Sequence, residues 1–190
     1  MALSSVQISN LALARIGILQ GIDDLDEASD EARACSLHLD ACRDDLLSAH
    51  DWPFARRTAG LGLVADDPED GWAYSYRLPS DCLVARTLGD GYAFKITSDA
   101  SGGLLYANTN PATLIYTARV EDVALLPHDV AMLLASRLAM DIAPALARTD
   151  SVTDRAAQRF RTDLAAATTT RQNEPEQDAH REAEAISGRE

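Results

Sequence analysis

The spacing of apolar residues changes period twice along this chain, and that change limits the folds it can adopt. Up to Pro53 the apolar residues recur every three or four positions, as they do on one face of a helix. From residue 56 to residue 118 they tend to alternate with polar residues, and after Pro127 the helical spacing returns. The pattern predicts a helical part, a β part and a second helical part, in that order.

The first helix has clear end signals. Ser4 and Gln7 have the spacing of a capping box, in which each side chain satisfies a backbone donor of the other residue. Gly17 follows the apolar stripe and supplies a left-handed stop. The sequence therefore predicts a short helix between these signals.

A second, longer helix is predicted to begin at a similar box formed by Asp24 and Glu27. Its apolar seam contains many small residues, and it ends at Trp52-Pro53, because the residue before a proline is driven out of helical geometry. A helix of about 24 residues is roughly 36 Å long, so other helices must lie beside it to bury the seam. The seam residues are Ala28, Ala32, Cys35, Leu39, Cys42, Leu46 and Ala49.

The middle part reads as short strands separated by tight turns. Gly, Asp, Asn and Ser cluster between the apolar stretches, which predicts one antiparallel sheet of meander type. The predicted strands lie at 72–78, 83–88, 92–96, 104–107 and 113–117.

Helical spacing after Pro127 predicts two more helices. Pro144 should kink or end the first of them. The second is predicted to open at Ser151, with Asp154 as its box partner. The apolar face of the first contains Val130, Leu133, Leu134, Leu138 and Ile142.

Together these elements predict the α+β class, with a discontinuous antiparallel helical bundle and a small antiparallel β-sheet insertion. The predicted helical domain combines residues 1–55 and 119–170, and the insertion spans 56–118. Residues 171–190 form a polar tail with almost no large apolar side chains, which we expect to order only against a partner.

The charge balance argues against nucleic acid as a specific ligand. The 190 residues include 30 acidic side chains and 17 Lys and Arg, which gives a formal net charge of −13. Binding to the phosphate backbone of a nucleic acid requires basic side chains. No apolar run reaches the ~18 residues of a membrane span, and the start of the chain lacks the features of a signal peptide. We expect no membrane partner and a protein that stays in the compartment where it is made.

The residue types needed for catalysis do not form a recognisable motif. The four histidines lack zinc-site spacing, and no phosphate-binding loop or nucleophile elbow occurs. The odd number of cysteines predicts reduced thiols that pack in the core. We therefore predict no catalytic, cofactor-binding or metal-binding residues. The histidines are His38, His50, His128 and His180, and the cysteines are Cys35, Cys42 and Cys82.

Two features leave alternatives open. Acidic clusters at 23–27 and 66–70 have the chemistry of a weak calcium site but lack the loop pattern that makes such a site specific, and capping or a solvated turn explains them as well. The aromatic residues around Trp52 and Trp72 suit either a hydrophobic joint between bundle and insertion or a platform for a sugar or base.

Several segments resemble the tail tubular protein A family, the head-to-tail adaptor proteins of tailed phages. They are LALARIGI at 11–18, the segment from Ser29 to Arg57 that ends in DWPFARR, and GWAYSYRLPSDCL at 71–83. Residues 116–120 and 134–143 also fit, so the resemblance covers roughly residues 5 to 165. The motif residues that we expect to have structural roles are Arg43, Asp44, Leu46, Trp52, Pro53, Phe54, Arg56, Trp72, Tyr74, Tyr76, Leu78 and Pro79.

The resemblance implies a virion protein without catalysis, assembled in the host cytoplasm and located at the neck. Its implied partners are eleven further copies in a dodecameric ring, the portal protein, and a tail, nozzle or stopper protein. Genomic DNA would pass through the channel without specific binding. It also implies that the tail reaches the portal, through Arg171, Glu174, Pro175, His180 and Arg181.

Two rival functions remain. One is a monomeric binding module whose aromatic sheet recognises a glycan or peptide. The other, less favoured, is a hydrolase that uses Asp66, Asp67 or Glu69 with a metal ion.

Overall fold

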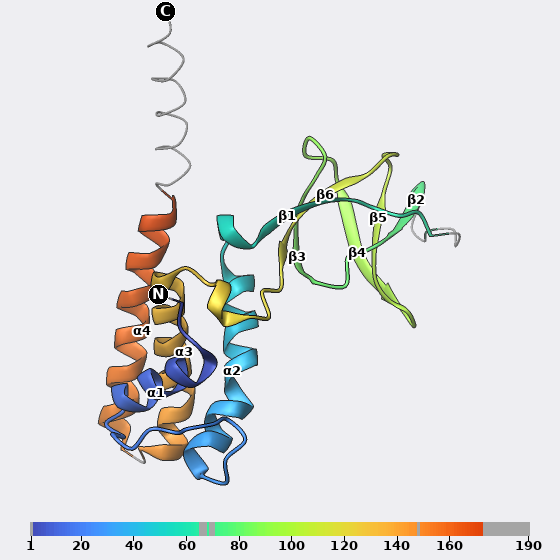
Figure 1. The fold of residues 1–190 in the computed structure, drawn as a ribbon. Coiled ribbons are helices and arrows are strands. Elements are labelled where there is room, and N and C mark those ends of the chain that lie inside the picture. Colours follow the sequence, from blue (N-terminus) through green and yellow to red (C-terminus); the bar gives the residue numbers. More distant parts are fainter. Residues whose placement is uncertain (1, 65–67, 69–70, 148, 173–190) are drawn as a thin grey trace, which may run out of the picture. The chain divides into compact units, whose positions relative to one another are not determined.

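The computed structural model describes residues 2–64, 68, 71–147 and 149–172, which divide into two compact units (Figure 1). One unit combines the residues up to Leu46 with those from Glu121 onward, and the other is the continuous stretch Leu47–Val120. The first contains helices and the second contains antiparallel strands, so the chain belongs to the α+β class.

Helix α1 (Ser5–Arg15) has the ends that the sequence predicts. The Gln7 amide donates to the Ser4 hydroxyl at 3.2 Å, and the Ser4 amide donates to the Gln7 side chain at 2.9 Å. After the helix, Gly17 adopts a φ of 89°, which favours glycine because a Cβ is strained there. The capping box and the glycine stop are both confirmed.

Helix α2 (Asp30–Ala49) begins later than predicted, so the assignment of Asp24 and Glu27 as its cap is wrong. Ser29 is the residue whose hydroxyl accepts from the Ala32 amide, at 3.1 Å. Glu27 instead accepts from the Ser29 hydroxyl at 2.7 Å. A serine directly before the helix places its oxygen closer to the free amides than the earlier acidic residues can.

Helix α3 (His128–Leu146) includes Pro144 in its last turn and continues for two more residues. A proline in the last turn removes one backbone donor where few helical hydrogen bonds remain to be broken. The helix therefore does not end at Pro144 and is not divided into two helices. Helix α4 (Asp150–Gln172) begins one residue before the predicted start. The Thr149 carbonyl accepts its first amide bonds, so the predicted box of Ser151 and Asp154 is not the helix start.

Helix α3 is the centre of the helical unit. Both α1 and α4 contact it, and Figure 1 shows the three side by side. The apolar face of α3 is predicted correctly, since its members are at most 1% exposed. They are Val130, Leu133, Leu134, Leu138 and Ile142, and Ile8 and Leu13 of α1 are equally buried.

The β unit contains two three-stranded antiparallel sheets rather than the single predicted meander. Their strand orders are β1-β6-β3 and β2-β5-β4. Among the described strands, β4 and β5 are the one pair that is both consecutive in sequence and hydrogen-bonded. The antiparallel pairing is confirmed, whereas the meander is wrong. The strands are β1 (Arg56–Gly60), β2 (Tyr74–Arg77), β3 (Cys82–Leu88), β4 (Phe94–Asp99), β5 (Gly102–Ala107) and β6 (Thr113–Ala118).

The two sheets share one core. Its buried residues come from β2, β3, β5 and β6 and from Ala112 just before β6. These strands belong to both sheets, so each sheet buries its apolar face against the other. The core contains Tyr76, Leu88, Leu105, Ala107, Ala112, Leu114, Tyr116 and Ala118.

Within the described ranges, no helix combines the length and apolar character needed to cross a bilayer.

Candidate functional site

Arg43 is the motif residue that joins the two stretches of the helical unit. It lies in α2 and is only 7% exposed. Its guanidinium donates to Asp40 at 2.9 Å, to Asp44 at 3.0 Å and to the backbone carbonyl of Glu121 at 3.1 Å. A buried charge with these acceptors is compensated, so Arg43 stabilises the connection between α2 and the start of the second stretch.

The Trp52-Pro53-Phe54 motif forms the turn that follows α2. Pro53 is the first residue of the short helix η1 (Pro53–Ala55), where a missing amide has no cost. Trp52 is 1% exposed and contacts the His50 ring edge-on, with ring centroids 5.5 Å apart. The ring centroids of Phe54 and Trp52 are 6.1 Å apart, and Arg56 forms an ion pair with Asp51. These residues fix the path of the chain into β1.

Arg86 is a structural residue that the sequence analysis missed. From β3 it donates to the Ser48 carbonyl at 3.0 Å and to the His50 carbonyl at 2.8 Å, at the end of α2. Its Nε donates to the Thr117 hydroxyl at 2.9 Å. One sequence signal could have identified it, namely a single arginine within an otherwise apolar strand. A charge that is half-buried in a strand needs hydrogen-bond acceptors, so its partners must lie nearby.

Tyr76 belongs to the β core and is not an exposed aromatic surface. It is 1% exposed, and its hydroxyl donates to the Thr109 carbonyl at 2.6 Å. Tyr74 and Leu78 are half-buried and pack against the same core. A glycan platform would need exposed rings, so burial of Tyr76 argues against that rival role.

The other predicted motif residues also have structural positions. Leu46 is 3% exposed in α2, and Trp72 is half-buried just before β2. The Pro79 carbonyl accepts from the Cys82 amide at 3.0 Å, which closes the turn into β3.

The structure does not describe the side chains of the residues predicted to contact the portal. Glu174, Pro175, His180 and Arg181 lie outside the described residues, as does the side chain of Arg171. The acidic residues Asp66, Asp67, Glu69 and Asp70 also lie outside them.

The three thiols are poor nucleophiles. Burial raises the pKa of Cys35, Cys42 and Cys82 above the usual thiol value. Cys42 also donates from Sγ to Asp141 at 3.3 Å, and the nearby carboxylate raises its pKa further. Over the described part of the chain, no three His, Cys, Asp or Glu side chains come together as metal ligands.

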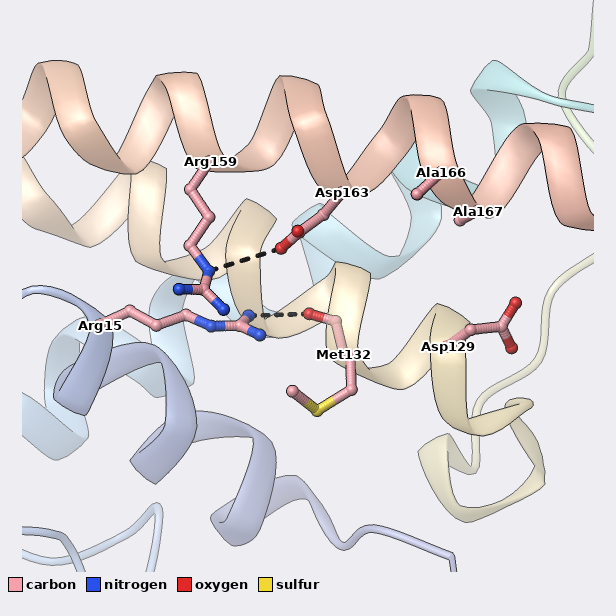
Figure 2. A pocket seen from close by; sticks show the side chains of 7 residues that line it. All are labelled: Arg15, Asp129, Met132, Arg159, Asp163, Ala166 and Ala167. Carbon is pink, nitrogen blue, oxygen red and sulfur yellow. Dashed lines mark hydrogen bonds and ion pairs between the residues drawn. The ribbon is translucent and has the colours of Figure 1, made fainter.

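A cavity of about 240 Å³ opens in the helical unit between α1, α3 and α4 (Figure 2). Figure 2 shows the guanidiniums of Arg15 and Arg159 close together at one end and Asp129 at the other. The lining residues are Arg15, Asp129, Met132, Arg159, Asp163, Ala166 and Ala167.

The two arginines are held by different partners. Arg15, in the last turn of α1, donates from Nη1 to the Met132 carbonyl of α3 at 2.7 Å. On α4, Arg159 Nε lies 3.5 Å from an Asp163 oxygen, which also accepts from the Ser136 hydroxyl. Burial lowers the pKa of Arg15, and the positive charge of Arg159 lowers it further. The described lining therefore carries two arginines and two aspartates, with Asp163 near the arginines and Asp129 at the other end.

This arrangement is suited to holding an anionic group by hydrogen bonds and charge. Its described lining contains neither histidine nor cysteine, so the chemistry present is recognition by guanidiniums and carboxylates. The sequence analysis missed all of these residues, because periodicity places Arg15 and Arg159 on helices but does not show that those helices are neighbours.

Comparison with known proteins finds no matching family model and no matching curated protein.

Proposed function

We propose that this chain is the subunit of a head-to-tail adaptor ring in the virion of a tailed phage. Twelve copies would dock beneath the portal, continue its DNA channel and provide the attachment surface for the tail. The observation that carries the proposal is the division of the chain, in which the two end stretches share one helical unit and the strands form a separate unit. That is the order of elements expected from the resemblance to the tail tubular protein A family.

The positions of the motif residues support an assembly role over catalysis. Arg43 joins the two stretches of the helical unit, and Trp52 and Tyr76 are 1% exposed. Arg43 bonds to two carboxylates and to the Glu121 carbonyl, Trp52 packs against the His50 and Phe54 rings, and Tyr76 bonds to the Thr109 carbonyl. Motif residues with such internal contacts stabilise the fold of the subunit, and an adaptor ring depends on a subunit of fixed shape.

The finer form of the fold belongs to this proposal. We infer that α1, α2, α3 and α4 act as a discontinuous antiparallel bundle and that this bundle supplies the surfaces that close the ring. Helix-to-helix packing between copies would make a heterologous contact, which forms a closed ring when the rotation between subunits divides a full turn.

The net charge fits a channel for DNA. Each copy carries a formal charge of −13, so a wall built from these subunits repels phosphates and does not hold the genome in place. We assign the contact with the portal protein to residues 171–190.

Electron microscopy of tailed particles that carry an affinity-tagged copy of the chain tests the proposal. We expect the tag at the neck, with twelve copies between portal and tail. Particles assembled without the chain should contain portals but fail to attach tails. Finding no copy of the protein in particles, or normal tails in its absence, would contradict the adaptor function.

A further inference from the structure

The cavity between α1, α3 and α4 contains more hydrogen-bond donors than the protein uses. A guanidinium carries five N–H donors. Among the described residues, Arg15 donates to one acceptor, the Met132 carbonyl, and Arg159 has one carboxylate partner, 3.5 Å away at Asp163. Two guanidiniums that face the same space with donors to spare are arranged to receive an oxygen anion.

The size of the cavity limits what can enter. Sites for drug-sized ligands and cofactors range from about 300 to 1,000 Å³. At about 240 Å³, this cavity suits a group the size of an amino-acid side chain. Met132 of α3 and Ala166 and Ala167 of α4 add apolar atoms to the lining, which suit the methylene groups of such a side chain.

The charges in the cavity favour a carboxylate over a phosphate. Asp163 already offsets part of the positive charge of the two arginines, and Asp129 lies at the opposite end (Figure 2). The four charges of the described lining cancel in sum, so the positive potential is confined to the end where the two guanidiniums lie. At that end the aspartates repel a singly charged carboxylate less strongly than a doubly charged phosphate.

We propose that this cavity receives an aspartate or glutamate side chain from a second copy of this chain, held by Arg15 and Arg159. The inference rests on the proposed function, because ring assembly supplies the second copy. The chain has 30 acidic side chains and only 17 Lys and Arg, so carboxylates outnumber cationic side chains on every copy. Asp23, Asp24 and Asp26 are exposed and lie outside the cavity lining. A contact between such an aspartate on one copy and the cavity of another would be heterologous, as a ring requires.

The main test variant is Arg159→Gln, with Arg155→Gln as its matched control. Arg159 has a side chain that is 55% exposed and does not support the core, whereas Arg15 links α1 to α3. Arg155 is exposed one turn earlier on α4, does not line the cavity and, among the described residues, bonds to the Ser151 carbonyl of its own helix at 3.2 Å. The two variants remove the same charge from the same helix.

Self-association of the full chain is measured by sedimentation equilibrium over concentrations up to about 1 mM, the range in which weak contacts are detected. We expect Arg159→Gln to weaken association by about tenfold or more, since a hydrogen bond to a charged group is lost, while Arg155→Gln stays within about twofold of the unaltered chain. Equal dissociation constants for self-association of the two variants would contradict the proposal that Arg159 holds the carboxylate. An unaltered chain that stays monomeric over the whole range overturns the second copy as the occupant.

Competition with small anions identifies the chemistry. Sodium glutarate should weaken association of the unaltered chain and of Arg155→Gln but have little effect on Arg159→Gln, at matched ionic strength. Inorganic phosphate that competes better than glutarate overturns the carboxylate assignment. A ring at the neck of particles together with unchanged association of Arg159→Gln overturns this site alone, whereas the absence of a ring overturns the proposed function.

Discussion

Arginine side chains connect parts of this chain that are distant in sequence. Arg43 reaches the Glu121 carbonyl, Arg86 reaches the end of α2, and Arg77 joins β2 to β4 through Asp99. In each case two or more N–H groups of one planar guanidinium are used, which a lysine ammonium cannot reproduce. Arginine rather than lysine is therefore required by the structure at these three positions.

The bond between Arg77 and Asp99 gives a residue-scale prediction about pH. Two parallel contacts of 2.7 Å lower the pKa of Asp99 from 3.8 to about 2, and the Arg77 side chain is the main cause. Because the folded-state pKa lies below the ordinary value, the ion pair contributes to stability above about pH 3.8 and is lost as the pH falls toward 2. Titration of the Asp99 carboxyl carbon by NMR measures this pKa directly.

The matched variants are Arg77→Gln and Arg57→Gln, which both remove an arginine from a β-strand. We expect Arg77→Gln to return the Asp99 pKa toward 3.8, while Arg57→Gln leaves it near 2. If Asp99 of the unaltered chain already titrates near 3.8, the ion pair does not form in solution.

At the scale of elements, the sequence predicts helices better than strands. The end signals of α1 are local, so both are correct. The start of α2 is missed because several capping side chains compete between residues 23 and 29, and the pattern alone does not rank them. Strand β1 is missed because Arg56–Gly60 has no alternation of apolar and polar residues, and it becomes a strand by pairing with β6.

Gly17 provides a prediction about the end of α1. Its φ of 89° is left-handed, and no atom lies within 4 Å of an added Cβ, so backbone strain is the only expected cost. Gly17→Ala should lower the free energy of unfolding by about 1–2 kcal/mol in urea denaturation. Gly62→Ala is the control, because its Cβ also meets open space without a left-handed φ, and we expect a change below about 1 kcal/mol. Equal losses in both variants would contradict the role of Gly17.

At the scale of the whole molecule, the order of helices and strands follows from the sequence, but the arrangement of neighbours does not. Which strands pair across two sheets, and which helices line the cavity, depend on contacts between distant residues. Arg15 meets Met132, and Cys42 meets Asp141, yet no periodicity links these positions. The candidate site therefore required the structure, whereas the apolar face of α3 did not.

The division into two units predicts that the helical unit folds without the strands. Arg43 contacts the Glu121 carbonyl at 3.1 Å, so the ends left by deleting Leu47–Val120 lie close enough to be joined by a Gly/Ser linker of about six residues. We expect a helical circular dichroism spectrum and cooperative thermal unfolding. Adding Leu134→Ala, at a fully buried position, should lower stability by about 2–5 kcal/mol.

A deletion variant that melts without a cooperative transition would contradict independent folding of the helical unit. A Leu134→Ala change that leaves the melting temperature unaltered would show that the remaining helices no longer pack as they do in the full chain.

The discontinuity of the helical unit also sets a sequence of events on the ribosome. Helices α1 and α2 are synthesised first, but α3, against which α1 packs, emerges only after the described strands have been translated. The strands form a continuous stretch and can fold as soon as β6 has left the exit tunnel. During translation, therefore, the apolar face of α1 stays exposed until α3 has been made, and this interval is when a nascent copy is most accessible to chaperones and proteases.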